Sequence, residues 1–210
     1  MKNFIFFLTS LLLFSLSHEI SSSRVVVENI TVIDAENPVR KDMTVILDGD
    51  EIMSIEKFSP NNVDTNNDDV VIDAKGKFLI PGLWDAHVHL TFIPELDHET
   101  AYSLFVMNGI TSIRDTGAIL DKLQPAIRYA QENPFNSPRL FYSGPLLDGT
   151  PNVYKGTEPG YPELSLEINA DTDIRALIDG LVAEGVSFIK TYEMLSADVF
   201  IELLKISEEK

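Results

Sequence analysis

The amino-acid sequence predicts a mixed α/β protein in which an all-β segment precedes a series of strand–helix units. Residues 24–80 alternate apolar and polar side chains, are rich in branched residues and show no helical periodicity. From residue 90 onward, short apolar strands alternate with longer helical patterns, which is typical of parallel βα units. The change occurs at Pro81-Gly82, just before the only two histidines of the chain that lie two residues apart, His87 and His89.

The first part of the fold is predicted to consist of paired strands. RVVVENITVID (24–34) reads as one strand. MTVILDGDEIMSIEKF (43–58) reads as a hairpin, because Asp48-Gly49-Asp50 is a tight-turn signal between two alternating runs. The polar stretch 61–69 is expected to be an exposed loop, and VVIDAKGKFLIPG (70–82) a strand, a turn and a second strand.

The second part is predicted to hold about four βα units. Helical patterns cover residues 99–109, 118–133, 171–185 and 196–210, and strand patterns after the histidine pair cover residues 110–117, 137–145 and 186–193. Asp97 is a candidate N-cap, Gly109 a helix stop, and Pro125 a helix start or kink. The Gly/Pro-rich stretch 145–170 is expected to be a long loop. A closed (β/α)₈ barrel takes about 250 residues, so these units could form half of one.

Composition excludes several kinds of site and partner. The chain has 210 residues, a formal net charge of −17 and no cysteine. An acidic surface repels a phosphate backbone, so no nucleic-acid partner is expected. The lack of cysteine rules out disulfides, thiolate metal ligands and cysteine nucleophiles.

Residues 1–23 are predicted to be a signal peptide rather than part of the fold. Lys2 precedes an apolar run, Phe4 to Leu16, and small residues follow. The run is shorter than the roughly 20 residues that a bilayer span needs, so no stable membrane anchor is expected, although an uncleaved signal anchor stays open. The protein is therefore expected to be exported, to the periplasm or the medium.

His87 and His89 are the sharpest candidate site. Residues i and i+2 of a strand point to the same face, so the two imidazoles can lie side by side and chelate one divalent ion such as Zn²⁺. The alternative is a strand end with one hydrogen-bonded and one solvated histidine, and for a bare H-x-H this is the more common case.

The context of the pair resembles a known family. GKFLIPGLWDAHVH (76–89) is similar to the entry motif of the amidohydrolase superfamily, NGITSIRDTG (108–117) to its second-strand segment and GVSFIKTY (185–192) to its fourth-strand segment. The resemblance favours the imidazolonepropionase-like and prolidase-like branch. It implies a β-sandwich segment over residues 24–81, followed by the first half of a TIM-like (β/α)₈ barrel over residues 82–210.

The resemblance also implies the chemistry. His87 and His89 would be metal ligands, and Lys190 would bridge one or two ions, with zinc expected, as a CO₂-derived carbamate. Burial at the end of an apolar strand favours a neutral lysine amine, the form that adds CO₂, although a salt bridge or solvent contact would also explain Lys190. Tyr192, which shares its face, is a candidate substrate contact. The implied reaction is hydrolysis of a C–N bond in a small amide or peptide-like substrate by metal-activated water.

Some groups that the resemblance implies have no counterpart in the chain. The family places two further histidine ligands after strands five and six and a general-base aspartate after strand eight, but no histidine follows His98. The aspartate is expected beyond residue 210, and no catalytic residue is assigned within the chain. We therefore expect a truncated or split polypeptide that is inactive and poorly soluble without its C-terminal half or a partner chain. The alternative is a non-catalytic remnant.

Four other side chains receive lesser roles. Asp115 is expected to fix a turn or cap the next helix, and Arg114 could pair with it. Asp85 is expected to be structural, and Trp84 to lie in the core.

Overall fold

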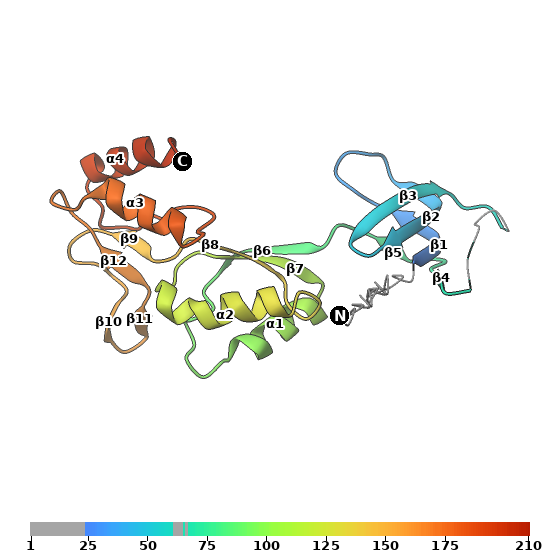
Figure 1. Cartoon of the computed structure of the whole chain (residues 1–210), viewed down its shortest axis with the longest axis horizontal. Helices are drawn as coiled ribbons and strands as arrows, with labels where there is room; N and C mark the ends of the chain where they lie inside the picture. Colours follow the sequence, from blue (N-terminus) through green and yellow to red (C-terminus); the bar gives the residue numbers. More distant parts are fainter. Residues whose placement is uncertain (1–23, 61–64, 66) are drawn as a thin grey trace, which may run out of the picture. The chain divides into compact units, whose positions relative to one another are not determined.

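In a computed structural model of the protein, the described residues are 24–60, 65 and 67–210. The predicted signal peptide and part of the predicted loop at 61–69 lie outside them. No helix among the described residues is long and apolar enough to cross a membrane. The chain divides into two compact units, one ending at Pro81 and the other beginning at Gly82 (Figure 1).

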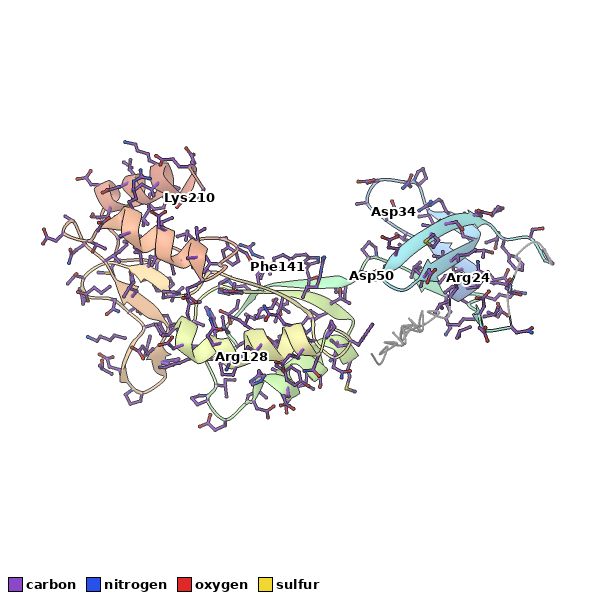
Figure 2. The ribbon with its side chains drawn as sticks, viewed as in Figure 1. Arg24, Asp34, Asp50, Arg128, Phe141 and Lys210 are labelled. Atoms are coloured by element: carbon purple, nitrogen blue, oxygen red, sulfur yellow. The ribbon has the colours of Figure 1, made fainter. Side chains whose placement is uncertain are left out.

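The first unit contains a five-stranded sheet. Its strands are β1 (Val25–Val32), β2 (Arg40–Asp48), β3 (Glu51–Lys57), β4 (Val70–Asp73) and β5 (Phe78–Leu79). β2 and β3 form the predicted hairpin, in which Gly49 takes a positive φ of 59° that a turn of this kind requires. β1 pairs antiparallel with β2 and parallel with β4 and β5. Arg24, at the start of β1 (Figure 2), forms an ion pair with Asp69, just before β4.

Apolar side chains of β1 and β2, with Ala74 after β4, form the small core of this unit. The buried residues are Ile30, Val32, Met43, Val45 and Ala74. Other apolar side chains of the sheet stay exposed, among them Ile52, Met53, Val70 and Val71. The described residues supply one layer, so the second layer of the expected sandwich remains a proposal.

The second unit begins with a parallel three-stranded sheet and two helices. The elements are β6 (Leu83–Val88), α1 (His98–Met107), β7 (Ile110–Asp115), α2 (Leu120–Glu132) and β8 (Arg139–Tyr142), with sheet order β6-β7-β8. Both helices lie on one side of this sheet (Figure 1). Their shared core is formed by buried Tyr102, Ile113, Ala118, Leu123, Ala126 and Ile127.

The local helix signals have the expected roles except at Pro125. Asp97 caps α1, since its carboxylate accepts from the Thr100 backbone N–H at 2.8 Å, and Gly109 follows the helix with a φ of 77°. Pro125 lies inside α2, five residues after its first residue Leu120. Pro125 therefore does not start the helix, and the alternative that it kinks the helix stays a prediction.

The stretch predicted to be a long loop contains short strands. They are β9 (Leu146–Asp148), β10 (Lys155–Glu158), β11 (Tyr161–Glu163) and β12 (Ser165–Glu167). β9 pairs parallel with β12, and β10 and β11 form a hairpin. The loop prediction is therefore wrong, because strands of three or four residues carry little periodicity of their own.

The predicted strand at 186–193 is an extended segment with a single β-bridge, between Leu147 and Thr191. Three backbone hydrogen bonds hold it beside β8 and β9: Ser187 donates to Tyr142, Leu147 donates to Lys190, and Tyr192 donates to Leu147. The segment thus follows the course of a fourth parallel strand without a full ladder.

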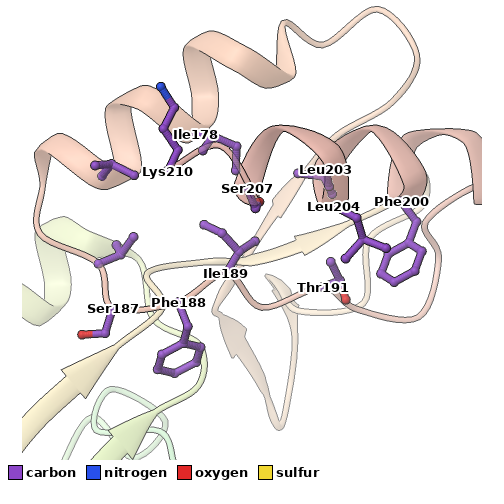
Figure 3. Close-up of a pocket in the computed structure, with 12 residues that line it drawn as sticks. Ile178, Ser187, Phe188, Ile189, Thr191, Phe200, Leu203, Leu204, Ser207 and Lys210 are labelled. Carbon is purple, nitrogen blue, oxygen red and sulfur yellow. The ribbon is translucent and has the colours of Figure 1, made fainter.

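The chain ends in two helices, α3 (Ile174–Ala183) and α4 (Ala197–Ser207). Asp173 and Ser196 cap them by accepting backbone N–H groups. The core that the helices share with β9 contains buried Leu147, Ile168, Ile174, Ile178, Leu181, Val199, Leu203 and Ile206. This packing places the segment 187–192 beside α3 and α4 (Figure 3).

Candidate functional site

The two histidines lie at the C-terminal end of β6. The register of β6 against β7 shifts between Asp85 and Val88, so the end of the strand is irregular there. The Nε2 atoms of His87 and His89 are 3.3 Å apart, and their ring planes are inclined by 74°. Two nitrogens at about 2.1 Å from one tetrahedral zinc ion lie about 3.4 Å apart. The spacing of the pair therefore fits chelation of a single ion.

A backbone carbonyl sets the orientation of His89. Nδ1 of His89 lies 3.0 Å from the carbonyl oxygen of Gly117. A carbonyl can only accept, so Nδ1 carries a proton, and in the neutral ring Nε2 then keeps its lone pair. This is the tautomer that a metal-ligating histidine needs, with its other nitrogen held by an acceptor. The sequence carries no signal for this contact, because it depends on how the chain turns after β7.

Asp115, the last residue of β7, is fully buried. Its Oδ2 accepts from the Leu90 backbone N–H at 2.7 Å, and its Oδ1 accepts from the Gly117 backbone N–H at 3.1 Å. Burial raises the pKa of Asp115, while the two backbone donors oppose that rise. Arg114 does not form the expected pair, because its guanidinium lies over the Phe188 ring, 4.3 Å from the centroid.

The surroundings of His87 favour the neutral imidazole. Desolvation lowers its pKa below the ordinary value of 6.5, and the charges of His89 and Lys190 lower it further, while Asp85 opposes them. Asp85 also accepts from the His87 backbone N–H at 3.1 Å, in keeping with a structural role. A neutral imidazole is the form that binds a metal ion.

Lys190 and Tyr192 come from the segment beside β9 and are both partly buried. The positive charge of Lys190 is one of the groups that lower the pKa of His87. No group of three or more His, Cys, Asp or Glu side chains that could hold a metal ion occurs among the described residues. A third ligand for the histidine pair must therefore be of another kind or come from elsewhere.

Aromatic rings connect Tyr192 to the histidines. Tyr192 lies 5.7 Å from Tyr154, Tyr154 lies 6.3 Å from Phe92, and Phe92 lies 6.3 Å from His89, measured between ring centroids. Burial first, and Tyr154 next, raise the pKa of Tyr192 to about 12, so its hydroxyl stays protonated. Phe92 was not among the sequence candidates, because a single aromatic residue in a loop carries no pattern.

The sheet face turned away from the helices carries a second aromatic group. Leu140 and Tyr142 pack into the core with α1 and α2, so Phe141 between them points the other way (Figure 2). Trp84 stacks on Phe141 at 5.0 Å and is 50% exposed. The prediction that Trp84 lies in the core is wrong, since no described layer covers this face.

An apolar pocket of about 580 Å³ lies apart from the histidines, between α3, α4 and the segment 186–191 (Figure 3). Phe188, Phe200, Leu203 and Leu204 contribute to its lining, which does not include His87, His89 or Lys190. Its lining carries no arrangement of acids or bases for catalysis.

Comparisons with solved structures identify the fold. A prolidase complexed with N-methylphosphonate-L-proline matches with a TM-score of 0.66 and 20% identity, over 89% of this chain and 54% of the other. Molinate hydrolase matches with a TM-score of 0.69 and 17% identity, over 90% and 52%. Ochratoxinase from A. niger matches with a TM-score of 0.68 and 13% identity, over 89% and 54%.

Sequence comparisons add no closer relative. No family model matches the chain, and no curated protein does. The chain spans about half the length of the solved structures it resembles. Those structures include a prolidase and an amidohydrolase, and the chain has the fold of about half of such a protein.

Proposed function

We propose that the protein is a metal-dependent hydrolase of C–N bonds in small amide or peptide-like substrates, with His87, His89 and Lys190 as metal ligands. The observation that carries the proposal is the 3.3 Å separation of the two Nε2 atoms. The structural relatives include a prolidase and a Xaa-Pro dipeptidase, which supports hydrolysis of an amide bond as the general kind of reaction.

The residues fit a divalent cation, with zinc as the expected one. His87 and His89 offer two neutral nitrogens at chelating distance. Lys190 would react with CO₂ through the small deprotonated fraction of its amine: a new N–C bond forms, a proton leaves to solvent, and the resulting carbamate would supply oxygen ligands to the ion. The bound ion would supply Lewis acidity and would lower the pKa of water.

The chain's own residues would then orient the substrate. Tyr192 carries its proton at neutral pH, as any tyrosine does, and its pKa of about 12 keeps the hydroxyl protonated in alkaline solution as well, so it would be a hydrogen-bond donor to a substrate oxygen. Phe92 and Tyr154 line the path between Tyr192 and His89 and would exclude water from that side.

We further propose that a complementing half, in the same polypeptide or in a partner chain, supplies the remaining ligands and the general base. The open edge of the segment 187–192 and the apolar pocket beside it would be its packing surface, in a barrel of which residues 82–210 are half. The relatives, about twice as long, support this arrangement. The chain alone would bind metal without turning over substrate.

Export is also part of the proposal, with residues 1–23 as the signal peptide. Fractionation of cells that express a C-terminally tagged chain tests it. Processed protein outside the cytoplasm is expected, and full-length protein confined to the cytoplasm would contradict it.

Cobalt binding tests the proposed ligands, because Co²⁺ reports its coordination through visible absorption. The wild-type chain is expected to give the spectrum of a nitrogen- and oxygen-ligated ion. His87→Ala and His89→Ala should abolish it, while His98→Ala, outside the pair, should not. Xaa-Pro dipeptides and N-acyl amino acids are the substrates to assay once the complementing half is supplied. A wild-type chain without any cobalt signal would favour a non-catalytic protein.

A further inference from the structure

We infer that Asp115 is the positioning residue of the histidine pair: its carboxylate fixes the ring orientation and tautomer of His89 by holding the backbone on both sides of that ring. The role in metal binding rests on the proposed function, whereas the effect on the tautomer does not.

The two oxygens of Asp115 act on two different segments. Oδ2 accepts from Leu90, the residue directly after His89, at 2.7 Å. Oδ1 accepts from Gly117 at 3.1 Å, and the carbonyl of the same Gly117 meets Nδ1 of His89 at 3.0 Å. One carboxylate therefore holds both the chain that carries the imidazole and the group that orients it.

Gly117 has no space for a side chain. A Cβ atom there would lie 2.7 Å from Cδ2 of Leu146 and 3.1 Å from Cε1 of His89. The imidazole thus packs directly against the Gly117 backbone, and a shift of that backbone would move the ring or break its hydrogen bond.

Only an acid at residue 115 serves both segments. Asparagine has the same shape but a single acceptor oxygen, so one of the two backbone N–H groups would face an amide N–H instead. Since Asp115 is fully buried, water cannot replace the lost partner without a rearrangement.

Asp148 is a matched control, because its carboxylate also accepts backbone N–H groups, in another part of the fold. Asp148 is also fully buried, and it accepts backbone N–H groups of Gly149, Val153 and Met194 at 2.9, 2.8 and 2.7 Å. It makes no hydrogen bond to His89 or Gly117 among the described contacts. Asp148→Asn therefore costs a comparable backbone anchor without touching the histidine pair.

The test is ¹⁵N NMR of the histidine rings in the metal-free chain, at a pH where both imidazoles are neutral. In the wild type, His89 is expected to carry its proton on Nδ1. Asp115→Asn should give a mixture of tautomers at His89, and Asp148→Asn should leave the wild-type pattern. A wild-type His89 protonated on Nε2 would overturn the inference, as would Asp148→Asn changing the pattern as much as Asp115→Asn.

Zinc affinity, measured by competition with a chromophoric chelator, is the second readout. Loss of an outer hydrogen-bond partner typically weakens metal binding about 10–100-fold. That loss is expected for Asp115→Asn and not for Asp148→Asn; equal affinities in all three proteins would overturn the metal-positioning role. If the wild type binds no zinc but only Asp115→Asn alters the tautomer, the positioning role stands and the proposed function fails.

Gly117→Ala provides an independent variant in case Asp115→Asn does not fold. It keeps the carboxylate, while its Cβ would crowd Leu146 and the His89 ring beside the Gly117 carbonyl. The same change of tautomer is expected, and an unchanged His89 would contradict the inference.

Discussion

His87 and His89 have different surroundings although they are two residues apart. Nδ1 of His89 lies against the Gly117 carbonyl, whereas His87 is more exposed, and its pKa is lowered first by desolvation and then by nearby charges. Both features would favour a bound ion, since one imidazole is oriented in advance and the other is kept neutral by desolvation and nearby charges. The two histidines are therefore expected to respond differently to substitutions around them.

Removal of the Lys190 charge should raise the pKa of His87. Lys190 is one of the groups that lower this pKa, so Lys190→Met takes away part of the shift. The pKa can be followed by NMR titration of the ring protons. Lys122→Met, which removes a lysine paired with Glu163, is the control and should leave the pKa of His87 unchanged. An unchanged pKa in Lys190→Met would place the amine away from the pair.

The depressed pKa of His87 also predicts a pH dependence of stability. In acid the unfolded chain, in which the pKa is near 6.5, binds more protons at this residue than the folded chain does. The free energy of unfolding should therefore fall as the pH drops through the window between 6.5 and the lower folded pKa.

Urea unfolding at pH 7.5 and 5.5 measures this effect. The loss between the two pH values should be smaller in His87→Gln than in the wild type. An equal loss in both proteins would show that other groups dominate the window.

The sequence predicts that His87 and His89 share one face, but it does not predict the Gly117 carbonyl that orients His89. A period of two places His87 and His89 on one face, and the separation of the nitrogens agrees with chelation. The Gly117 contact depends on a turn after another strand, which no local pattern encodes. Trp84 was wrongly assigned to the core because burial depends on which face of the sheet a helix covers.

At the scale of elements, two glycines illustrate how packing decides the effect of one methyl group. A Cβ at Gly149 would overlap the carbonyl oxygen of Met194, which is backbone and cannot move aside easily. Gly149→Ala should lower the free energy of unfolding by about 1–3 kcal/mol. Denaturant unfolding measures the change.

Gly180→Ala is the matched substitution within α3. A Cβ there meets nothing within 4 Å, and alanine is the better helix former. It should raise the free energy of unfolding by about 0.5–1 kcal/mol. A rise in the free energy of unfolding in both variants would show that the backbone around Gly149 has room for a methyl group.

Helices were more predictable than short strands for a physical reason. Caps such as Asp97 and Ser196 act on residues within one turn, so the sequence alone contains the signal. β9 and β12 pair across the stretch 149–164, and such non-local partners leave little trace in either strand. The loop prediction for residues 145–170 failed for that reason.

At the scale of the whole molecule, the apolar pocket beside α4 is expected to bind a hydrophobic dye. Leu204, which lines it, is 48% exposed, so Leu204→Glu should fold and should reduce the fluorescence of bound 8-anilinonaphthalene-1-sulfonate. Phe135→Glu is the control, because Phe135 is 94% exposed and does not line the pocket. Equal loss in both variants would show that the dye does not report this pocket.

The strand–helix order predicted the mixed α/β fold, which the solved structures match over about 90% of the chain, while the sandwich and the half barrel stay predictions. The sequence pattern did not predict that the sheet face with Trp84 is exposed, because exposure depends on which elements pack against that face.

A crystal structure of the zinc-loaded chain tests the central claim most directly. Nε2 of His87 and of His89 should each lie about 2.0–2.1 Å from the same ion, with an oxygen of carbamylated Lys190 at about 2.0–2.2 Å. An ion bound elsewhere, or Lys190 unmodified and turned away from an ion held by the two imidazoles, would contradict it.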